Sequence, residues 1–320
     1  MSPILVVTID TEVDKDRFWR IANPATFKSI TEGVPGILSP LFDRYEVQPT
    51  YLLSPEVIED DASVRELRKL LDRGRAELGS HLHAEFVEPQ RTRFTHNMSG
   101  AEAHALQRQY PADVEYDKIE NLTELFHKKF GVLPTAFRAG RYGIREQTFS
   151  ALAALGYRVD SSVTPGLRWQ LKEGTLDFRD FPVGPYWVDT PRGEILELPI
   201  SIAPVSKASP FVRDLPRPLH WAVSKVLGGR VGYRWLRPSF HGGKEMIDFL
   251  SRSHDQIFVM MFHSTEIVCK ASPYAQTPDE VQQIVNGMEA VFKYCREQGF
   301  EFRTMSQTVE HVKPQAAACD

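Results

Sequence analysis

The chain has 320 residues, of which 25% are charged and 42% hydrophobic, and its net charge is −4 at pH 7. This composition is typical of a globular protein that buries a full core, and a net negative charge argues against nucleic acid as a partner. The cysteines, Cys269, Cys295 and Cys319, include no closely spaced pair, which argues against a disulfide framework or a cysteine zinc site.

Residues 1–8 lack the basic start and the long apolar core of a signal peptide. The chain also contains no run of about 18 apolar residues, the length that a membrane-spanning helix needs. We therefore expect a cytoplasmic protein.

Strand-like and helix-like stretches alternate along the chain. Apolar or β-branched runs predict strands at 3–9, 47–53, 76–81, 135–138, 157–160, 195–200, 256–262 and 300–303. Helical periodicity that ends at a glycine predicts helices at 63–73, 112–130, 145–155 and 279–298. Such alternation is typical of a parallel sheet, and the number of strands favours a closed or nearly closed α/β barrel over an open sheet.

We predict one domain over residues 1–314, with insertions at about 84–111 and 204–240 and a disordered tail at 315–320. Residues 213–237 contain six basic residues and one acid, with aromatic residues between them. This segment is either a surface for anionic lipid headgroups or a substrate diphosphate, or an amphipathic insertion that packs over the barrel. No oligomeric state is indicated.

Acids, histidines and one arginine stand at or just past the ends of the predicted strands: Asp10, Glu12, His81, His83, Arg138, Asp160 and His263. In parallel barrels the carboxyl ends of the strands meet on one face and carry the reactive groups. Carboxylates and histidines are ligands for a divalent metal and also serve as general acids and bases. The pattern therefore predicts a metal-dependent hydrolase.

Five short motifs contain these residues, at 8–12, 79–83, 137–143, 156–162 and 262–266. In order and spacing they resemble the motifs of the polysaccharide deacetylase (NodB-homology) family, carbohydrate esterase family 4. The resemblance implies a distorted (β/α)7-type barrel in a single domain with loop insertions. It also implies removal of N- or O-acetyl groups from sugars with a divalent metal, for which zinc is the first choice.

The resemblance implies a role for each site residue. Glu12, His81 and His83 would bind the metal, Asp10 would be the general base, and His263 would be the general acid.

Further roles follow from the same resemblance. Arg138 would pair with the base, and Asp160 would orient His263 or contact the substrate. Arg141, Tyr142 and Trp187 would bind substrate, with the backbone N–H near Tyr142 helping to bind the oxyanion.

Two positions depart from the family pattern. Thr11 stands where an adjacent second aspartate is usual, so either Asp10 or Glu12 could be the metal carboxylate. Glu85 stands where the second histidine is usual, four residues after the first; we favour His83 as the ligand and keep Glu85 as the alternative.

The favoured function is removal of an N-acetyl group from an amino sugar. The substrate would be a cytoplasmic glycoconjugate intermediate in polysaccharide or antibiotic biosynthesis. Trp19, Trp169 and Trp187 suit stacking on a sugar face. The alternatives are an amidohydrolase acting on a non-sugar cyclic amide and a catalytically silent carbohydrate-binding protein on the same fold.

Overall fold

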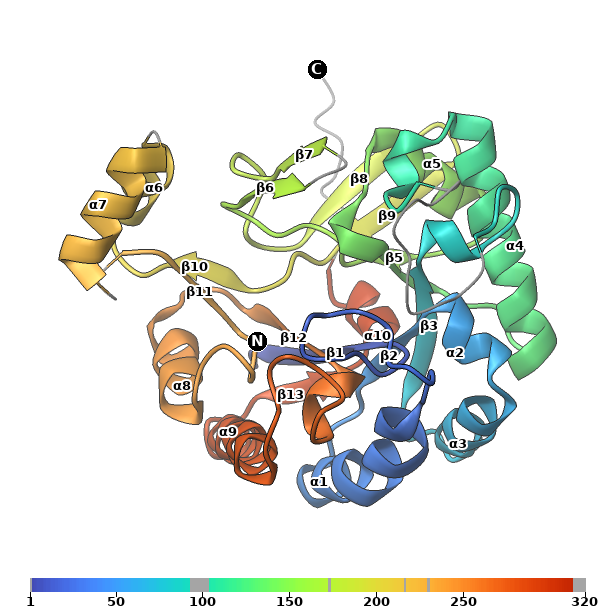
Figure 1. The fold of residues 1–320 in the computed structure, drawn as a ribbon, viewed down its shortest axis with the longest axis horizontal. Helices are drawn as coiled ribbons and strands as arrows, with labels where there is room; N and C mark the ends of the chain where they lie inside the picture. Colours follow the sequence, from blue (N-terminus) through green and yellow to red (C-terminus); the bar gives the residue numbers. More distant parts are fainter. Residues whose placement is uncertain (1, 93–103, 172–173, 216, 229–230, 313–320) are drawn as a thin grey trace.

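The computed structural model describes residues 2–92, 104–171, 174–215, 217–228 and 231–312, and its centre is a curled nine-stranded sheet (Figure 1). The strands are β1 (Ile4–Thr11), β2 (Thr50–Leu53), β3 (Glu77–Leu82), β4 (Ala136–Ala139), β5 (Val159–Asp160), β8 (Tyr186–Thr190), β9 (Gly193–Glu197), β12 (Ile257–His263) and β13 (Glu301–Arg303). They lie in the order β12-β1-β2-β3-β4-β5-β9-β8, and β13 also pairs with β1.

The sheet forms a half-barrel of parallel strands. Each neighbouring pair from β12 to β9 is parallel, and only β8, at the edge, is antiparallel to its neighbour. Beyond β9 the chain returns to β12, where Ser201 N–H donates to the Val259 carbonyl and Val259 N–H donates to Ser201 Oγ. The predicted α/β barrel and all eight predicted strands are confirmed.

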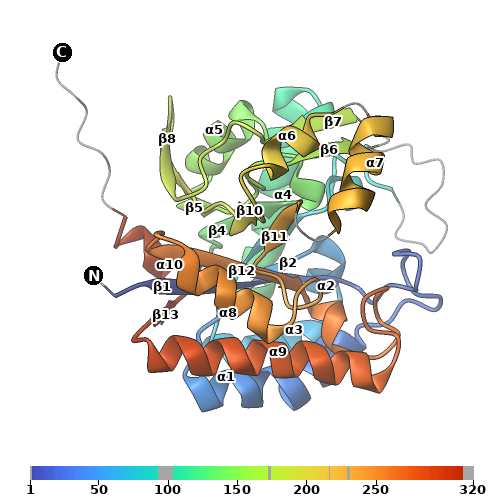
Figure 2. The ribbon, with the colours of Figure 1, turned by 90° about the vertical axis from the view of Figure 1, so that its left-hand side faces the viewer.

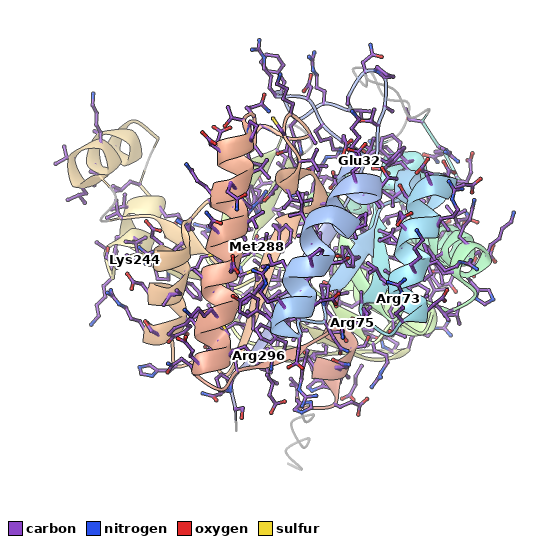
Figure 3. All side chains as sticks on the ribbon, turned by 90° about the horizontal axis from the view of Figure 1, so that it is seen from below. Glu32, Arg73, Arg75, Lys244, Met288 and Arg296 are labelled. Atoms are coloured by element: carbon purple, nitrogen blue, oxygen red, sulfur yellow. The ribbon has the colours of Figure 1, made fainter. Side chains whose placement is uncertain are left out.

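Helices cover the outer face of the sheet. They are η1 (Ser29–Leu38), α1 (Ser39–Tyr45), α2 (Pro55–Glu59), α3 (Asp61–Asp72), α4 (Ala112–Phe130), α5 (Glu146–Ala154), α8 (Gly243–Arg252) and α9 (Pro278–Glu297). Figure 3 shows η1, α3, α8 and α9 running side by side beneath the sheet. The predicted start of α9 is confirmed, because Thr277 and Glu280 form a reciprocal capping box.

Side chains on the two faces of β1 enter two separate cores. Leu5, Val7 and Ile9 pack against the outer helices, whereas Ile4 and Val6 pack inside the curl of the sheet. The inner core is closed at the amino end of the strands by α10 (Met305–Val309). Burial on both faces explains why β1 is a nearly continuous apolar run instead of an alternating one.

Several elements were not predicted from the sequence. Among the strands these are the hairpin β6 (Arg168–Leu171) and β7 (Gly174–Asp177), the edge strand β8, and the pair β10 (Ile202–Pro204) and β11 (Tyr233–Trp235). Among the helices they are η1, α1, α2, α8, α10, α6 (Ser209–Arg213) and α7 (Arg217–Leu227). Figure 1 and Figure 2 show α6 and α7 projecting away from the sheet. These strands are short and partly exposed, so they lack the apolar runs that mark the central strands.

The predicted disordered tail, 315–320, lies outside the described residues. Within the part of the chain that the structure describes, no helix combines the length and the apolar character needed to cross a bilayer.

Gly79 in β3 is predicted to be intolerant of a side chain. A Cβ atom there would lie 2.6 Å from the Ala136 carbonyl oxygen and 2.9 Å from the Leu52 side chain. Because the neighbouring strand backbone cannot move aside cheaply, we expect Gly79→Ala to lower the free energy of unfolding by about 1–3 kcal/mol, measured by urea denaturation.

Gly36 provides the matched control, because a Cβ atom there would meet nothing within 4 Å and the residue lies inside a helix. Gly36→Ala should leave stability unchanged or raise it slightly. Equal stability of the two variants would contradict the close strand packing at Gly79.

Candidate metal centre

Parallel strand register brings the predicted site residues together at the carboxyl edge of the sheet. Asp10 on β1 is the register partner of His263 on β12, and His81 on β3 is the partner of Arg138 on β4. Residues at the same level of adjacent parallel strands present neighbouring side chains, so sequence positions more than 250 residues apart meet here.

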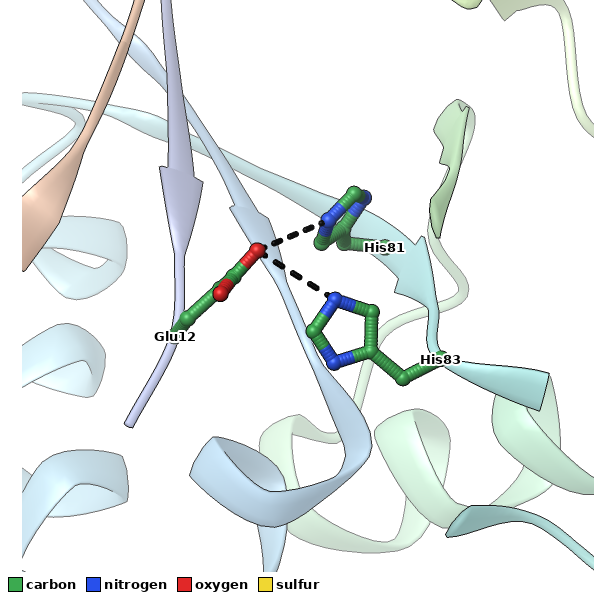
Figure 4. Close-up of side chains that lie close together, drawn as sticks. All are labelled: Glu12, His81 and His83. Atoms are coloured by element: carbon green, nitrogen blue, oxygen red, sulfur yellow. Dashed lines mark hydrogen bonds and ion pairs between the residues drawn. The ribbon is translucent and has the colours of Figure 1, made fainter. Parts of the chain in front are cut away.

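Glu12, His81 and His83 converge on one point (Figure 4). Glu12 Oε1 lies 3.3 Å from His81 Nε2 and 3.2 Å from His83 Nε2. All three residues are buried, and their ligand atoms lie within 4.8 Å of one another. One carboxylate and two imidazoles form a donor set that suits zinc and leaves further coordination positions for water and substrate.

The outer nitrogens of both imidazoles have acceptors, which is the arrangement that a metal site requires. His81 Nδ1 lies 3.0 Å from the Arg138 carbonyl oxygen, and His83 Nδ1 lies 3.1 Å from Glu56 Oε1. These acceptors favour the tautomer with the proton on Nδ1, so that each ring, when neutral, directs its Nε2 lone pair at the centre. The residues present therefore fit a divalent metal.

The charges around the centre are strongly coupled. Burial acts to raise the pKa of Glu12, but Lys15, whose Nζ lies 3.1 Å from Glu12 Oε2, and His83 lower it well below its usual range. Burial acts to lower the pKa of His83, but Glu56 and Glu12 raise it to about 10. In the metal-free protein His83 therefore carries a proton that metal binding must displace.

Asp10 stands beside the metal centre and is held by Arg138. Arg138 Nη1 donates to Asp10 Oδ1 at 2.6 Å, and the other guanidinium N–H groups donate to Thr8 and Ser161. Burial acts to raise the pKa of Asp10, but Arg138, His81 and His263 lower it below its usual value. Asp10 is thus an ionised carboxylate at neutral pH.

His263 faces both carboxylates from the opposite side of the site. Its Nε2 lies 3.9 Å from Asp10 Oδ2 and 3.8 Å from Glu12 Oε1. Its Nδ1 lies 2.9 Å from Glu266 Oε1, and Arg237 pairs with the same carboxylate oxygen. Glu266 therefore holds the ring with Nε2 toward the site.

Sequence reasoning missed Glu56, Lys15, Glu266 and Arg237. Glu266 could have been found, because it lies three residues after His263, within the fifth motif, in the one-turn helix η6 (Ser264–Ile267). The other three lie in α2 or in loops and carry no motif signal.

Asp160 does not contact His263. Its carboxylate accepts hydrogen bonds from Ser162 N–H and Ser162 Oγ, and it shares the buried space between β5 and β9 with Glu197. Burial and Asp160 together raise the pKa of Glu197 well above its usual range, and burial raises the pKa of Asp160. Burial beside Asp160 therefore favours the protonated form of Glu197. Glu266 occupies the position beside His263 that we expected for Asp160.

Trp187 and Glu85 also lie away from the converging ligands. The Trp187 indole N–H donates to the Val312 carbonyl oxygen, on the inner-core side of the sheet, and the residue does not line the pocket described below. Glu85 is buried and ion-paired with Arg141 at 2.7 Å. The sequence left His83 and Glu85 as alternatives for one metal ligand. The structure groups His83 with Glu12 and His81.

A pocket of about 420 Å³ opens over the metal centre. Its size is within the range of small-ligand sites. Its walls are formed by Asp10, Glu12, Lys15, Trp19, His81, His83, Ala139, Arg141, Tyr142, Trp169, Leu171, Arg237, Phe240, His263 and Tyr274.

Aromatic side chains form the wall of this pocket. Tyr142 and Trp169 stack at 5.6 Å between ring centroids, and Trp19 meets His263 edge-on at 4.9 Å. Arg141 and Tyr142 belong to the turn η4 (Gly140–Tyr142) and both have left-handed backbone, with φ of 52° and 59°. Such conformations cost energy in residues other than glycine, and they are found at sites where surrounding contacts hold them.

The fold of this chain is similar to that of several solved structures. A Mycobacterium smegmatis protein named as a polysaccharide deacetylase matches all of this chain and 98% of its own, with 15% identity and a TM-score of 0.52. The allantoinase PuuE matches 98% of this chain and 92% of its own, with 10% identity and a TM-score of 0.53.

A 4-α-glucanotransferase from Thermococcus litoralis also has a similar fold, with 14% identity and a TM-score of 0.55. The match covers 98% of this chain and 41% of that enzyme. No family model and no curated protein sequence matches the chain. At these identities the shared property is the fold, a barrel that polysaccharide deacetylases also have.

Metal-stripped protein is expected to bind about one zinc ion per chain, because three buried ligand atoms already converge. His81→Ala combined with His83→Ala should abolish binding. At neutral pH zinc uptake should release a proton from His83, detectable as a buffer-dependent heat in isothermal titration.

Glu85→Gln is the control for zinc uptake, since Glu85 lies outside the converging ligands. Loss of zinc binding in Glu85→Gln together with its retention in His83→Ala would overturn the ligand assignment.

The Glu197 carboxyl predicts a pH dependence of stability. A pKa raised in the folded state gives stability that is fully present below the unfolded pKa and is lost as pH rises through the folded pKa. Glu197→Gln, which cannot ionise, should therefore lose less stability than wild type between about pH 5 and about pH 8 in urea denaturation. Parallel losses in both proteins would contradict a raised pKa of Glu197 in the folded protein.

Proposed function

We propose that the protein is a metal-dependent hydrolase that removes the acetyl group from the nitrogen of an amino sugar. The observation that carries this proposal is that Asp10 and His263 lie together beside the Glu12, His81 and His83 ligands: His263 Nε2 is 3.9 Å from Asp10 Oδ2 and 3.8 Å from Glu12 Oε1. A carboxylate and an imidazole next to one metal position are the acid–base pair that amide hydrolysis needs.

Each residue then has a defined task. Glu12, His81 and His83 would hold the metal, which would lower the pKa of water and polarise the acyl oxygen. Asp10, kept ionised by Arg138, takes the proton of the attacking water. His263, held at Nδ1 by Glu266, donates a proton from Nε2 to the departing sugar nitrogen.

The pocket wall supports a sugar as the substrate. Trp19, Trp169 and Tyr142 offer aromatic faces and edges above the ligands, and sugar rings stack on such surfaces through their C–H faces. The backbone N–H near Tyr142 is our candidate donor to the oxyanion. Trp187 is not part of this proposal, because it lies outside the pocket.

A cyclic amide is the second candidate substrate. The structure named as an allantoinase has the same fold at a TM-score of 0.53, and the same acid, base and metal ligands would serve ring opening. The two candidates share the chemistry and differ in what the aromatic wall binds.

Zinc-loaded protein should release acetate from N-acetylated amino sugars in a panel that includes free, nucleotide-linked and lipid-linked forms. Cyclic amides and ureides in the same panel test the second candidate. Turnover of a cyclic amide alone would replace the sugar proposal, and binding of acetylated sugars without turnover would favour a silent carbohydrate-binding protein.

His263→Ala should lower kcat by about 10²–10⁴-fold, because the leaving nitrogen loses its proton donor. Zinc stoichiometry should be unchanged, which separates this effect from loss of the metal. His254→Ala, which removes an exposed histidine outside the site, should keep full activity. Full activity in His263→Ala would contradict the assignment of the acid.

A further inference from the structure

Helices α6 and α7 form a projection beside the barrel (Figure 1). They follow β10 and precede β11, which pair as a two-stranded antiparallel ribbon. Arg213 at the end of α6 donates to the Gly166 carbonyl and to Tyr233 Oη, so the base of the projection is fixed to the body of the protein.

The apolar face of α7 is turned to solvent. Leu219, Ala222, Val223 and Val226 follow the spacing i, i+3, i+4, i+7, which places them on one face of a helix. Val226 is 84% exposed and Leu219 is 53% exposed, and Phe211 on α6 is 78% exposed. A surface helix ordinarily buries this face against the core, so the exposed face indicates a partner.

The same segment is strongly basic. Residues 205–232 contain five basic residues and one acid, although the whole chain has a net charge of −4. Among these, Lys207 and Lys225 are exposed. An exposed apolar helix face flanked by basic residues is the pattern of helices that lie in the interface of an anionic bilayer.

We propose that the α6–α7 projection docks on an anionic lipid surface, with Phe211, Leu219 and Val226 entering the headgroup layer and Lys207 and Lys225 contacting lipid phosphates. Two copies of this chain would bring like charges together if they paired through this face, which opposes that alternative. An anionic bilayer satisfies both the apolar and the basic character of the surface.

Strand β11 connects the projection to the pocket. Beyond β11 the chain runs directly into Arg237 and Phe240, which line the pocket over the metal centre. The projection and one pocket wall thus belong to one short stretch of chain. The lipid-binding inference does not depend on the proposed activity, because a catalytically silent protein would dock in the same way.

The test is sedimentation of the full-length protein with phosphatidylcholine vesicles that contain or lack phosphatidylglycerol. We expect binding to the anionic vesicles that weakens as salt is raised, because screening reduces attraction between the basic residues and the phosphates. Phe211→Ser combined with Val226→Ser should lower the partition coefficient on the order of tenfold or more, through lost apolar burial.

Val183→Ser is the matched control, because Val183 is 57% exposed and lies outside the projection; it should bind as wild type does. The inference would be overturned if wild type stayed in the supernatant with anionic vesicles. It would also be overturned if Phe211→Ser with Val226→Ser bound as tightly as wild type, or if that variant converted a wild-type dimer to a monomer in sedimentation velocity without changing vesicle binding.

Discussion

The Arg138 guanidinium lies between the carboxyl ends of β1, β4 and β5 without exposure to solvent, and it donates to Asp10 at 2.6 Å. Its remaining N–H groups donate to Thr8 Oγ1 and to the carbonyl and Oγ of Ser161. A buried charge held by an ion pair and four hydrogen bonds is stable in place, whereas removal of its partner would leave an unpaired charge at a cost of about 3–5 kcal/mol. The proposed base is therefore fixed by the fold itself.

The same residue reaches the metal centre through its backbone. The Arg138 carbonyl accepts from His81 Nδ1, while the Arg138 side chain holds Asp10. A shift of β4 would therefore move the proposed base, Asp10, and at the same time rotate the imidazole of the metal ligand His81. Glu56 and Glu266 act in the same sense on His83 and His263, so each histidine of the site is oriented by an acceptor behind it.

The central strands and the converging ligands could be predicted from the sequence, because both depend on local patterns. Apolar runs mark the buried parallel strands, and the side chains that follow them necessarily meet at one edge of the sheet. Two of the orienting residues, Glu56 and Arg237, could not be predicted. They reach the site from segments whose positions depend on long-range packing, which periodicity does not encode. Asp160 and Trp187 show the same limit, because a strand position does not tell which layer receives the side chain.

The metal assignment can be checked in a crystal structure of the zinc-loaded protein, with anomalous scattering recorded at the zinc edge. We expect an anomalous peak bonded to Glu12, His81 and His83, with Asp10 beside it and still paired with Arg138. A peak bonded to Asp10 in place of Glu12, or to Glu85 in place of His83, would show that the ligands are wrongly assigned, as would zinc bound only outside this pocket.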